Sequence, residues 1–194
     1  KYDANYGNFN AYVNYTLQYT KGIADSPTQA FSREGQSLDP INKLIPMSWD
    51  QRHTFNITLA YNQSNYGLSG TAYFNSGTPY TFQPLSESSL AQINLLPNND
   101  YKPFNYNIDL TGYYAFKIGG YDSRITFSIY NLTDRLNEMW VNSKTGKAYT
   151  DILSQSQIEG YRSNFSTIEE TYRNPSMYSA PRSVKIGFEF KIKW

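Results

Sequence analysis

One short segment places an acid, a cation and a base close together, and it is the first place to look for chemistry. Asp50, Arg52 and His53 lie within four residues, and His53 is the single histidine of the chain. An aspartate and a histidine could form two members of a hydrolytic triad. Neighbouring positions on a strand point to opposite faces, however, and no third group is fixed nearby by the spacing. We therefore expect this segment to be the polar start of a strand.

Two further motifs could suggest chemistry but have simpler interpretations. Asp134 and Arg135 are expected to form a charge network with Lys117 or Glu189. The glycines of 77–80 and 119–120 precede no helix, so neither segment is expected to cradle a phosphate. With no cysteine and one histidine in the chain, the sequence predicts no metal site and no cofactor, and we expect no enzyme activity.

The composition narrows the class of protein further. The chain has 194 residues with 17 basic and 16 acidic side chains, a net charge of +1, which argues against a nucleic-acid partner. It is 17% aromatic although its mean hydropathy is −0.63. No run of apolar residues is long enough for a transmembrane helix. The first residue is Lys1 and no signal peptide follows it, so we expect a fragment or a mature piece of a longer product.

Alternation of apolar and polar residues defines the elements that position these side chains. Six segments show period two, and each has about the 9–11 residues that a tilted strand needs to cross a bilayer. The predicted strands are 9–19, 54–62, 68–75, 104–118, 125–130 and 184–194.

The connections between these strands alternate between long and short. Long loops are expected at about 21–52, 81–103 and 136–181, whereas 63–65 and 119–123 are short and rich in Gly, Asn, Ser and Asp. Short turns on one rim and long loops on the other are typical of outer-membrane barrels. The strands are therefore expected to be sequential antiparallel neighbours.

The apolar face could pack on lipid or on the core of a soluble β-sandwich, and alternation alone does not decide between them. Aromatic residues gather at strand ends, as in the girdles of membrane barrels. They are Tyr15, Tyr19, Tyr61, Tyr80, Phe104, Tyr106, Phe116 and Trp194. This favours an all-β, antiparallel transmembrane barrel segment. Six strands are too few to close such a barrel, so further strands from this or another chain are expected.

Four motifs in order resemble the C-terminal strands of TonB-dependent outer-membrane receptors. They are 48–55 opening a strand, 75–81 closing the next, 130–135 after the fifth strand, and the ending 180–194. The resemblance implies that residues 1–194 form the last strands of a barrel of about 22 strands. It also implies an N-terminal plug domain, which this sequence does not contain, and coupling through that plug to an inner-membrane energy complex.

The resemblance also orients the chain in the bacterial outer membrane. The C-terminus and the short turns would lie in the periplasm, and the long loops would face outward and capture a nutrient such as a siderophore, glycan or peptide. Ending residues Phe188, Phe190, Ile192 and Trp194 resemble the signal that the barrel assembly machinery recognises. Expected partners are therefore lipid, the remaining strands and plug, the assembly machinery and a surface lipoprotein.

Loop residues that combine aromatic rings with charge are the candidate ligand contacts. They are Tyr80 and Phe82 in the second long loop, and Trp140, Tyr149, Tyr161 and Arg162 in the third. Packing of the loops on each other would use the same rings. The alternative function is a scaffold or passive pore in a multi-chain surface complex.

Overall fold

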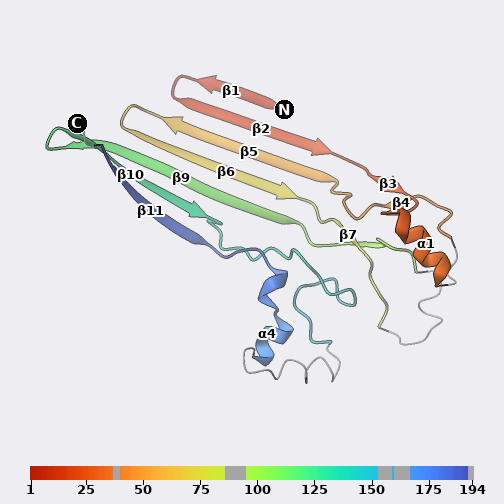
Figure 1. Cartoon of the computed structure of the whole chain (residues 1–194). Helices are drawn as coiled ribbons and strands as arrows, with labels where there is room; N and C mark the ends of the chain where they lie inside the picture. The colour runs from red at the N-terminus through yellow and green to blue at the C-terminus, as the bar shows by residue number, and fades with distance from the viewer. Residues whose placement is uncertain (37–39, 86–94, 153–158, 160–166, 192–194) are drawn as a thin grey trace.

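A computed structural model gives the fold, and it describes residues 1–36, 40–85, 95–152, 159 and 167–191. One antiparallel sheet dominates the chain, and the order of its strands in space is their order in sequence (Figure 1). The strands are β1 (Tyr2–Tyr6), β2 (Phe9–Leu17), β5 (His53–Asn62), β6 (Tyr66–Asn75), β9 (Asn105–Ile118), β10 (Tyr121–Tyr130) and β11 (Ser183–Phe190). The predicted all-β antiparallel class is confirmed.

The prediction of six strands was wrong by one. The additional strand is β1, which pairs with β2 from Tyr2 opposite Val13 to Tyr6 opposite Phe9. Gly7, with a φ of 57°, closes the tight turn between them, a conformation that glycine adopts without steric cost. The alternation of β1 extends over only five residues, which is short for a strand signal taken alone.

The register brings the large aliphatic residues of neighbouring strands to one face of the sheet. Leu59 of β5 lies opposite Ala11 of β2 and Gly70 of β6. Leu110 of β9 lies opposite Gly70 and, on the other side, Ile129 of β10. A slip of one residue would reverse every side chain of a strand, so the shared pattern fixes the pairing of neighbouring strands.

Two glycines in the sheet make room for aromatic rings. A Cβ on Gly112 would lie 2.5 Å from the ring of Phe127, its partner in β10. A Cβ on Gly67 would lie 2.3 Å from the ring of Tyr113, its partner in β9. The rings therefore cover the backbone on opposite faces of the sheet and compensate for the missing side chains.

Three turns lie at one end of the sheet and three long connections at the other (Figure 1). The long connections are 18–52, 76–104 and 131–182, close to the predicted loops. They hold short elements of their own, which are β3 (Lys21–Gly22), α1 (Pro27–Gly35), β4 (Ile45–Pro46), β7 (Pro79–Tyr80), β8 (Asp100–Tyr101), α4 (Ile168–Tyr172) and the 3-10 helix η1 (Pro175–Met177).

Apart from Ser123 of β10, the buried side chains of the described residues lie among these connections and not on the sheet. In the described part of the chain the fully buried apolar residues are Ile45, Met47 and Ala148, all in the long connections. On the apolar face of the sheet, Ile186 is 79% exposed and Phe188 is 59% exposed. No described helix makes an extensive contact with the sheet. Within the described residues, the apolar face of the sheet is therefore uncovered.

The sheet is open, with β1 and β11 as its two edges. The structure thus shows an antiparallel sheet but no closed barrel within the described residues. In those same residues, no helix combines the length and the apolar character needed to cross a membrane.

Candidate functional site

The structure separates the acid and the base of the 50–53 segment. Asp50 is completely buried, where its carboxylate accepts hydrogen bonds from the Thr20 backbone N–H at 2.7 Å and from the Tyr101 hydroxyl at 3.1 Å. His53 instead begins β5, and its Nδ1 lies 2.8 Å from the hydroxyl of Tyr15 on β2. The two side chains thus have separate partners and do not form a catalytic pair.

Asp50 is the anchor of the first two long connections. Arg52 Nε lies 3.5 Å from the Asp50 carboxylate, and Arg52 also donates a 2.6 Å hydrogen bond to the Tyr101 hydroxyl. The guanidinium lies over the ring of Tyr19 on one side and that of Tyr101 on the other. Burial and the hydrogen bond to Asp50 raise the pKa of Tyr101, which favours the protonated hydroxyl that donates to Asp50.

A second polar contact joins the same two connections. The Asn98 side chain is nearly buried and donates to Asp25 at 2.8 Å and to the Pro46 carbonyl at 3.0 Å. Its backbone N–H donates to the Thr81 hydroxyl. Buried polar groups satisfied in this way hold a single arrangement of the loops, because breaking them would leave unpaired donors and acceptors.

The third long connection is tied to the sheet by Asn137. Its side chain is 2% exposed and bridges the backbone of Tyr106, accepting from the N–H at 3.1 Å and donating to the carbonyl at 2.8 Å. Arg135 donates to the same amide and lies over the rings of Phe104 and Tyr106. The loops therefore start from fixed points at the rim.

The expected charge network of Asp134 and Arg135 with the sheet was wrong. Asp134 pairs instead with Arg182 across the end of the third connection, at 3.7 Å. Arg135 points to the aromatic rings described above and not toward Lys117 or Glu189, which lie near the opposite rim. Both residues therefore stabilise the loop ends.

Two of the predicted ligand residues lie where the second and third connections meet. Tyr80 donates a 2.9 Å hydrogen bond to Asp100, and burial and this bond raise the pKa of Tyr80 to about 12. A Cβ on Gly146 would lie 2.5 Å from the Tyr80 hydroxyl, so the third connection passes directly over it. Phe82 lies two residues further on, and the Asn99 side chain accepts a hydrogen bond from its backbone N–H and donates one to its carbonyl.

The other predicted ligand residues are spread over the third connection. Trp140 is 64% exposed, and the Lys102 ammonium lies over its ring, 4.8 Å from the ring centre. Tyr149 is half exposed and has no described contact to Trp140. Tyr161 and Arg162 lie outside the described residues. The structure thus gathers Tyr80 and Phe82 at one place and leaves Trp140 at another, beside Lys102.

Beside Lys102 the polar face of the sheet contains a cavity of about 270 Å³. Sequence reasoning missed Lys102 as a candidate site residue. The available signal was a cation directly after the aromatic Tyr101 and just before strand β9. Its ammonium donates to the Met139 carbonyl at 3.2 Å, and burial lowers its pKa. The other walls include Tyr73, Asn75 and Asn105. This is the point where the polar face opens toward the long connections.

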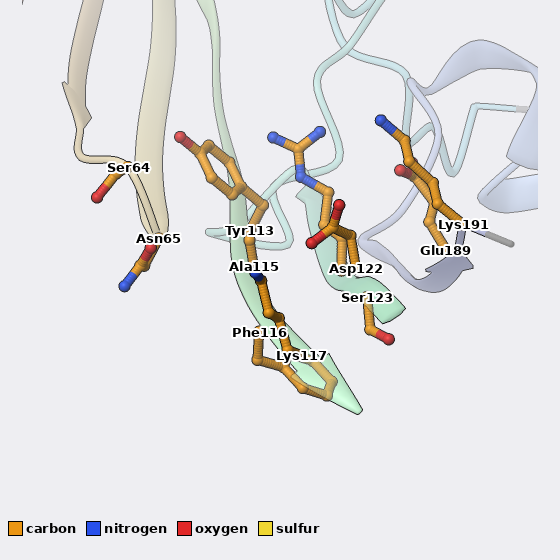
Figure 2. A pocket seen from close by; sticks show the side chains of 11 residues that line it. Ser64, Asn65, Tyr113, Ala115, Phe116, Lys117, Asp122, Ser123, Glu189 and Lys191 are labelled. Carbon is orange, nitrogen blue, oxygen red and sulfur yellow. The ribbon is translucent and has the colours of Figure 1, made fainter. Parts of the chain in front are cut away.

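A second cavity, of about 410 Å³, lies at the short-turn end of the same sheet. Figure 2 shows that its lining comes from the β5–β6 turn, from β9 and β10, and from the end of β11. Its charged residues are Lys117, Asp122, Arg124, Glu189 and Lys191. Among the residues that the structure describes, these five form no ion pair with one another.

Arg124 is the best-fixed side chain of this second cavity. Its guanidinium lies 4.1 Å from the centre of the Tyr113 ring, and the Tyr113 hydroxyl donates to the Gln63 carbonyl of the β5–β6 turn. The ring in turn covers Gly67, so three neighbouring strands contribute to one stack. This arrangement can present a cation on the polar face.

The predicted assembly residues are described in part. Phe188 and Phe190 lie on the edge strand β11, both on the apolar face and both exposed, and Phe190 contacts the ring of Tyr121. Ile192 and Trp194 lie outside the described residues. Over the described part of the chain no group of three or more potential ligand side chains could hold a metal ion.

Comparison of this chain with protein-family models, with curated proteins and with solved structures found no match.

Proposed function

We propose that this chain forms part of the wall of a bacterial outer-membrane β-barrel, a TonB-dependent receptor that imports a nutrient. The observation that carries the proposal is the continuous apolar face of seven strands, which stays uncovered while the polar face and the loops hold the buried contacts. An exposed apolar surface of this extent is typical of a site that meets another apolar phase.

The length of the strands supports lipid as that phase. Strands of 9 or 10 residues, such as β2, β5, β6 and β10, are about 30 Å long. Tilted by about 40°, they cover roughly the 25 Å apolar band of an outer-membrane barrel. Aromatic rings lie at the strand ends, where a membrane barrel has its girdle at the headgroup level. Tyr15 and Phe104 are two of them, and both are exposed.

The open edges of the sheet require strand partners in this proposal. Unpaired backbone groups of β1 and β11 would be costly in hydrocarbon, so each edge pairs with another strand of the closed barrel. In that closed form the polar face lines the interior. Its charged end, at the short turns, is where we place the contact with a plug domain.

The function that follows is transport, with no bond-making step assigned to this segment. The long connections, of which Asp50 and Asn98 join the first two and Asn137 fixes the third to the sheet, form a defined outer surface for ligand capture. The strands supply the wall, and energy would reach the receptor through the plug from the inner membrane.

Membrane fractionation and intact mass test this proposal together. The natural polypeptide that contains this sequence is expected in the outer-membrane fraction, with a mass several times 22.3 kDa. Recovery in the soluble fraction would refute the membrane assignment. Recovery in the outer membrane at a mass near 22.3 kDa would instead show a barrel shared by separate chains, which favours the scaffold or passive pore.

A further inference from the structure

The part of the polar face closest to the long connections is built from neutral side chains on β2, β5, β6 and β9. Two rows cross β2, β5, β6 and β9 in register. We call these eight residues the amide platform: Asn14, Asn56, Tyr73 and Asn107 in one row, and Thr16, Thr54, Asn75 and Asn105 in the other. Three strand spacings make the platform about 14 Å wide. It adjoins the cavity of about 270 Å³ beside Lys102.

Every member of the platform can both donate and accept hydrogen bonds. Five are asparagines, and the others carry hydroxyl groups. The amide oxygens of Asn75 and Asn107 are buried and have no hydrogen-bond partner among the described residues. A buried acceptor without a partner is costly, so a ligand that supplies donors here, such as hydroxyl groups, would be stabilised.

The charged side chains around the platform are already bound within the protein. Asp109, one row further along β9, accepts from the Asn107 side chain at 2.7 Å and from the Asn131 backbone at 2.8 Å. Lys102 donates to a backbone carbonyl and lies against Trp140.

The remaining charges at this rim are engaged in the same way. Arg52 is held by Asp50 and Tyr101, and the Glu138 carboxylate accepts from the Ala148 backbone. The rim thus carries charges of both signs, the Lys102 ammonium and the carboxylates of Asp109 and Glu138, each bonded only to neutral groups. A ligand of either sign would be attracted by one and repelled by the other, so it would lose its hydration for little net electrostatic gain.

The opposite half of the same face has the reverse character. Lys117, Arg124 and Lys191 lie there with Asp122 and Glu189 around the second cavity (Figure 2). Along the strands the neutral rows of the platform thus give way to charged positions, first Asp109 and Lys185 and then the five around the second cavity. A division of this kind points to different occupants at the two ends.

We propose that the amide platform binds a neutral, hydroxyl-rich ligand, an oligosaccharide, on its way from the loops into the barrel. This inference rests on the proposed function and names the substrate class of that receptor. Sugar hydroxyls donate to amide oxygens and accept from amide N–H groups, and the ring of Tyr73 offers a stacking surface at the centre of the platform.

Two asparagines of the same strand and the same face provide a matched test. Asn56 lies in the platform, and Asn62 lies six residues along β5, about 20 Å away near the short turns. We expect Asn56→Ala to weaken oligosaccharide binding tenfold or more. Asn62→Ala should change the Kd by less than twofold, because it removes the same amide from the charged half.

The assay is an array of neutral and acidic oligosaccharides, together with the cationic siderophore ferrioxamine B, probed with the detergent-extracted full-length protein. Calorimetry then gives the Kd of the strongest binder for the wild type and both variants. The expected result is a neutral oligosaccharide as the strongest binder and a loss confined to Asn56→Ala.

Three outcomes would overturn the inference. They are a charged strongest binder or no binder at all, equal losses in the two variants, and a loss of thermal stability in Asn56→Ala at unchanged affinity. The last would show that another protein segment covers the platform. Fractionation of the same cells separates the two proposals. If the protein is in the outer membrane but fails these tests, only the oligosaccharide proposal is refuted and the membrane proposal stands.

Discussion

Removing the Asp50 carboxylate tests whether the long connections form one fixed layer. The carboxylate is completely buried and accepts two hydrogen bonds, from Thr20 and Tyr101, besides its ion pair with Arg52. Breaking a buried ion pair costs about 3–5 kcal/mol. Because the Arg52 side chain is 36% exposed and can return to water, we take the low end, about 3 kcal/mol for Asp50→Ala.

This cost should appear as local opening of the loops and not as unfolding of the sheet. A change of 3 kcal/mol corresponds to a roughly 100-fold larger population of the open form. Limited proteolysis of the folded full-length protein measures that population when opening is fast relative to cleavage. We expect cleavage in 18–52 to accelerate by about that factor, while resistance of the strands stays unchanged.

A matched control is Asp134→Asn at the exposed ion pair with Arg182. Both side chains of that pair are 49% exposed, and such pairs contribute about 0–1 kcal/mol. Asparagine also keeps the acceptor for the Arg182 backbone N–H and tolerates the positive φ of 54° at this position. Equal cleavage of wild type and Asp50→Ala, or equal acceleration by the control, would refute the assignment of Asp50 as the anchor.

Three further substitutions test the assignment of the two faces of the sheet, the packing of the second long connection and the pKa of Tyr80. Leu110→Arg on the apolar face should cost about 2–4 kcal/mol of stability in lipid, measured by denaturant titration in vesicles, whereas Thr111→Arg on the polar face should be milder; equal costs would reverse the assignment of the faces. Gly77→Ala should loosen the second connection, seen as faster proteolysis there, because its Cβ would lie 1.7 Å from the Lys102 carbonyl oxygen; an unchanged rate would show that the backbone moves freely. Tyr80, with a pKa raised to about 12, favours the folded loops fully below pH 10, and this contribution is lost as the pH rises from 10 to 12; Tyr80→Phe should remove one phenolate absorbance step near pH 12, and an unchanged absorbance near pH 12 would contradict the hydrogen bond to Asp100.

The main strands, and which residues share a face, could be predicted because period two is a local signal that the pairing then reinforces. Leu59 and Leu110 lie on the same face, as their positions in the alternation predict, and the short turns lie where Gly and Asn occur. The strand Tyr2–Tyr6 was missed because five residues give a weak pattern. Helix α1 was also missed, although Ser26 caps it and Pro27 begins it, because the alternation of strands was the signal being followed.

The rim contacts could not be predicted because they join residues that are distant in sequence. Asp50 meets Tyr101 across 51 residues, and Asn98 meets Asp25 across 73. The alternation of apolar and polar residues contains no information about contacts between residues so far apart in the sequence. For the same reason the segment that contains Asp50 and His53 suggested catalysis, whereas the fold gives these side chains different partners.

The most direct test of the central claim is quenching by brominated phospholipids along β9. These 194 residues contain no cysteine, so single cysteines carrying a fluorophore can be placed at 107–111 in the full-length protein once cysteines elsewhere in it are replaced. The account predicts strong quenching at Ile108 and Leu110 and little at Asn107, Asp109 and Thr111. Gly112 is avoided because a Cβ there would meet the Phe127 ring. Quenching without alternation, or no quenching at any position, would contradict a lipid-facing sheet.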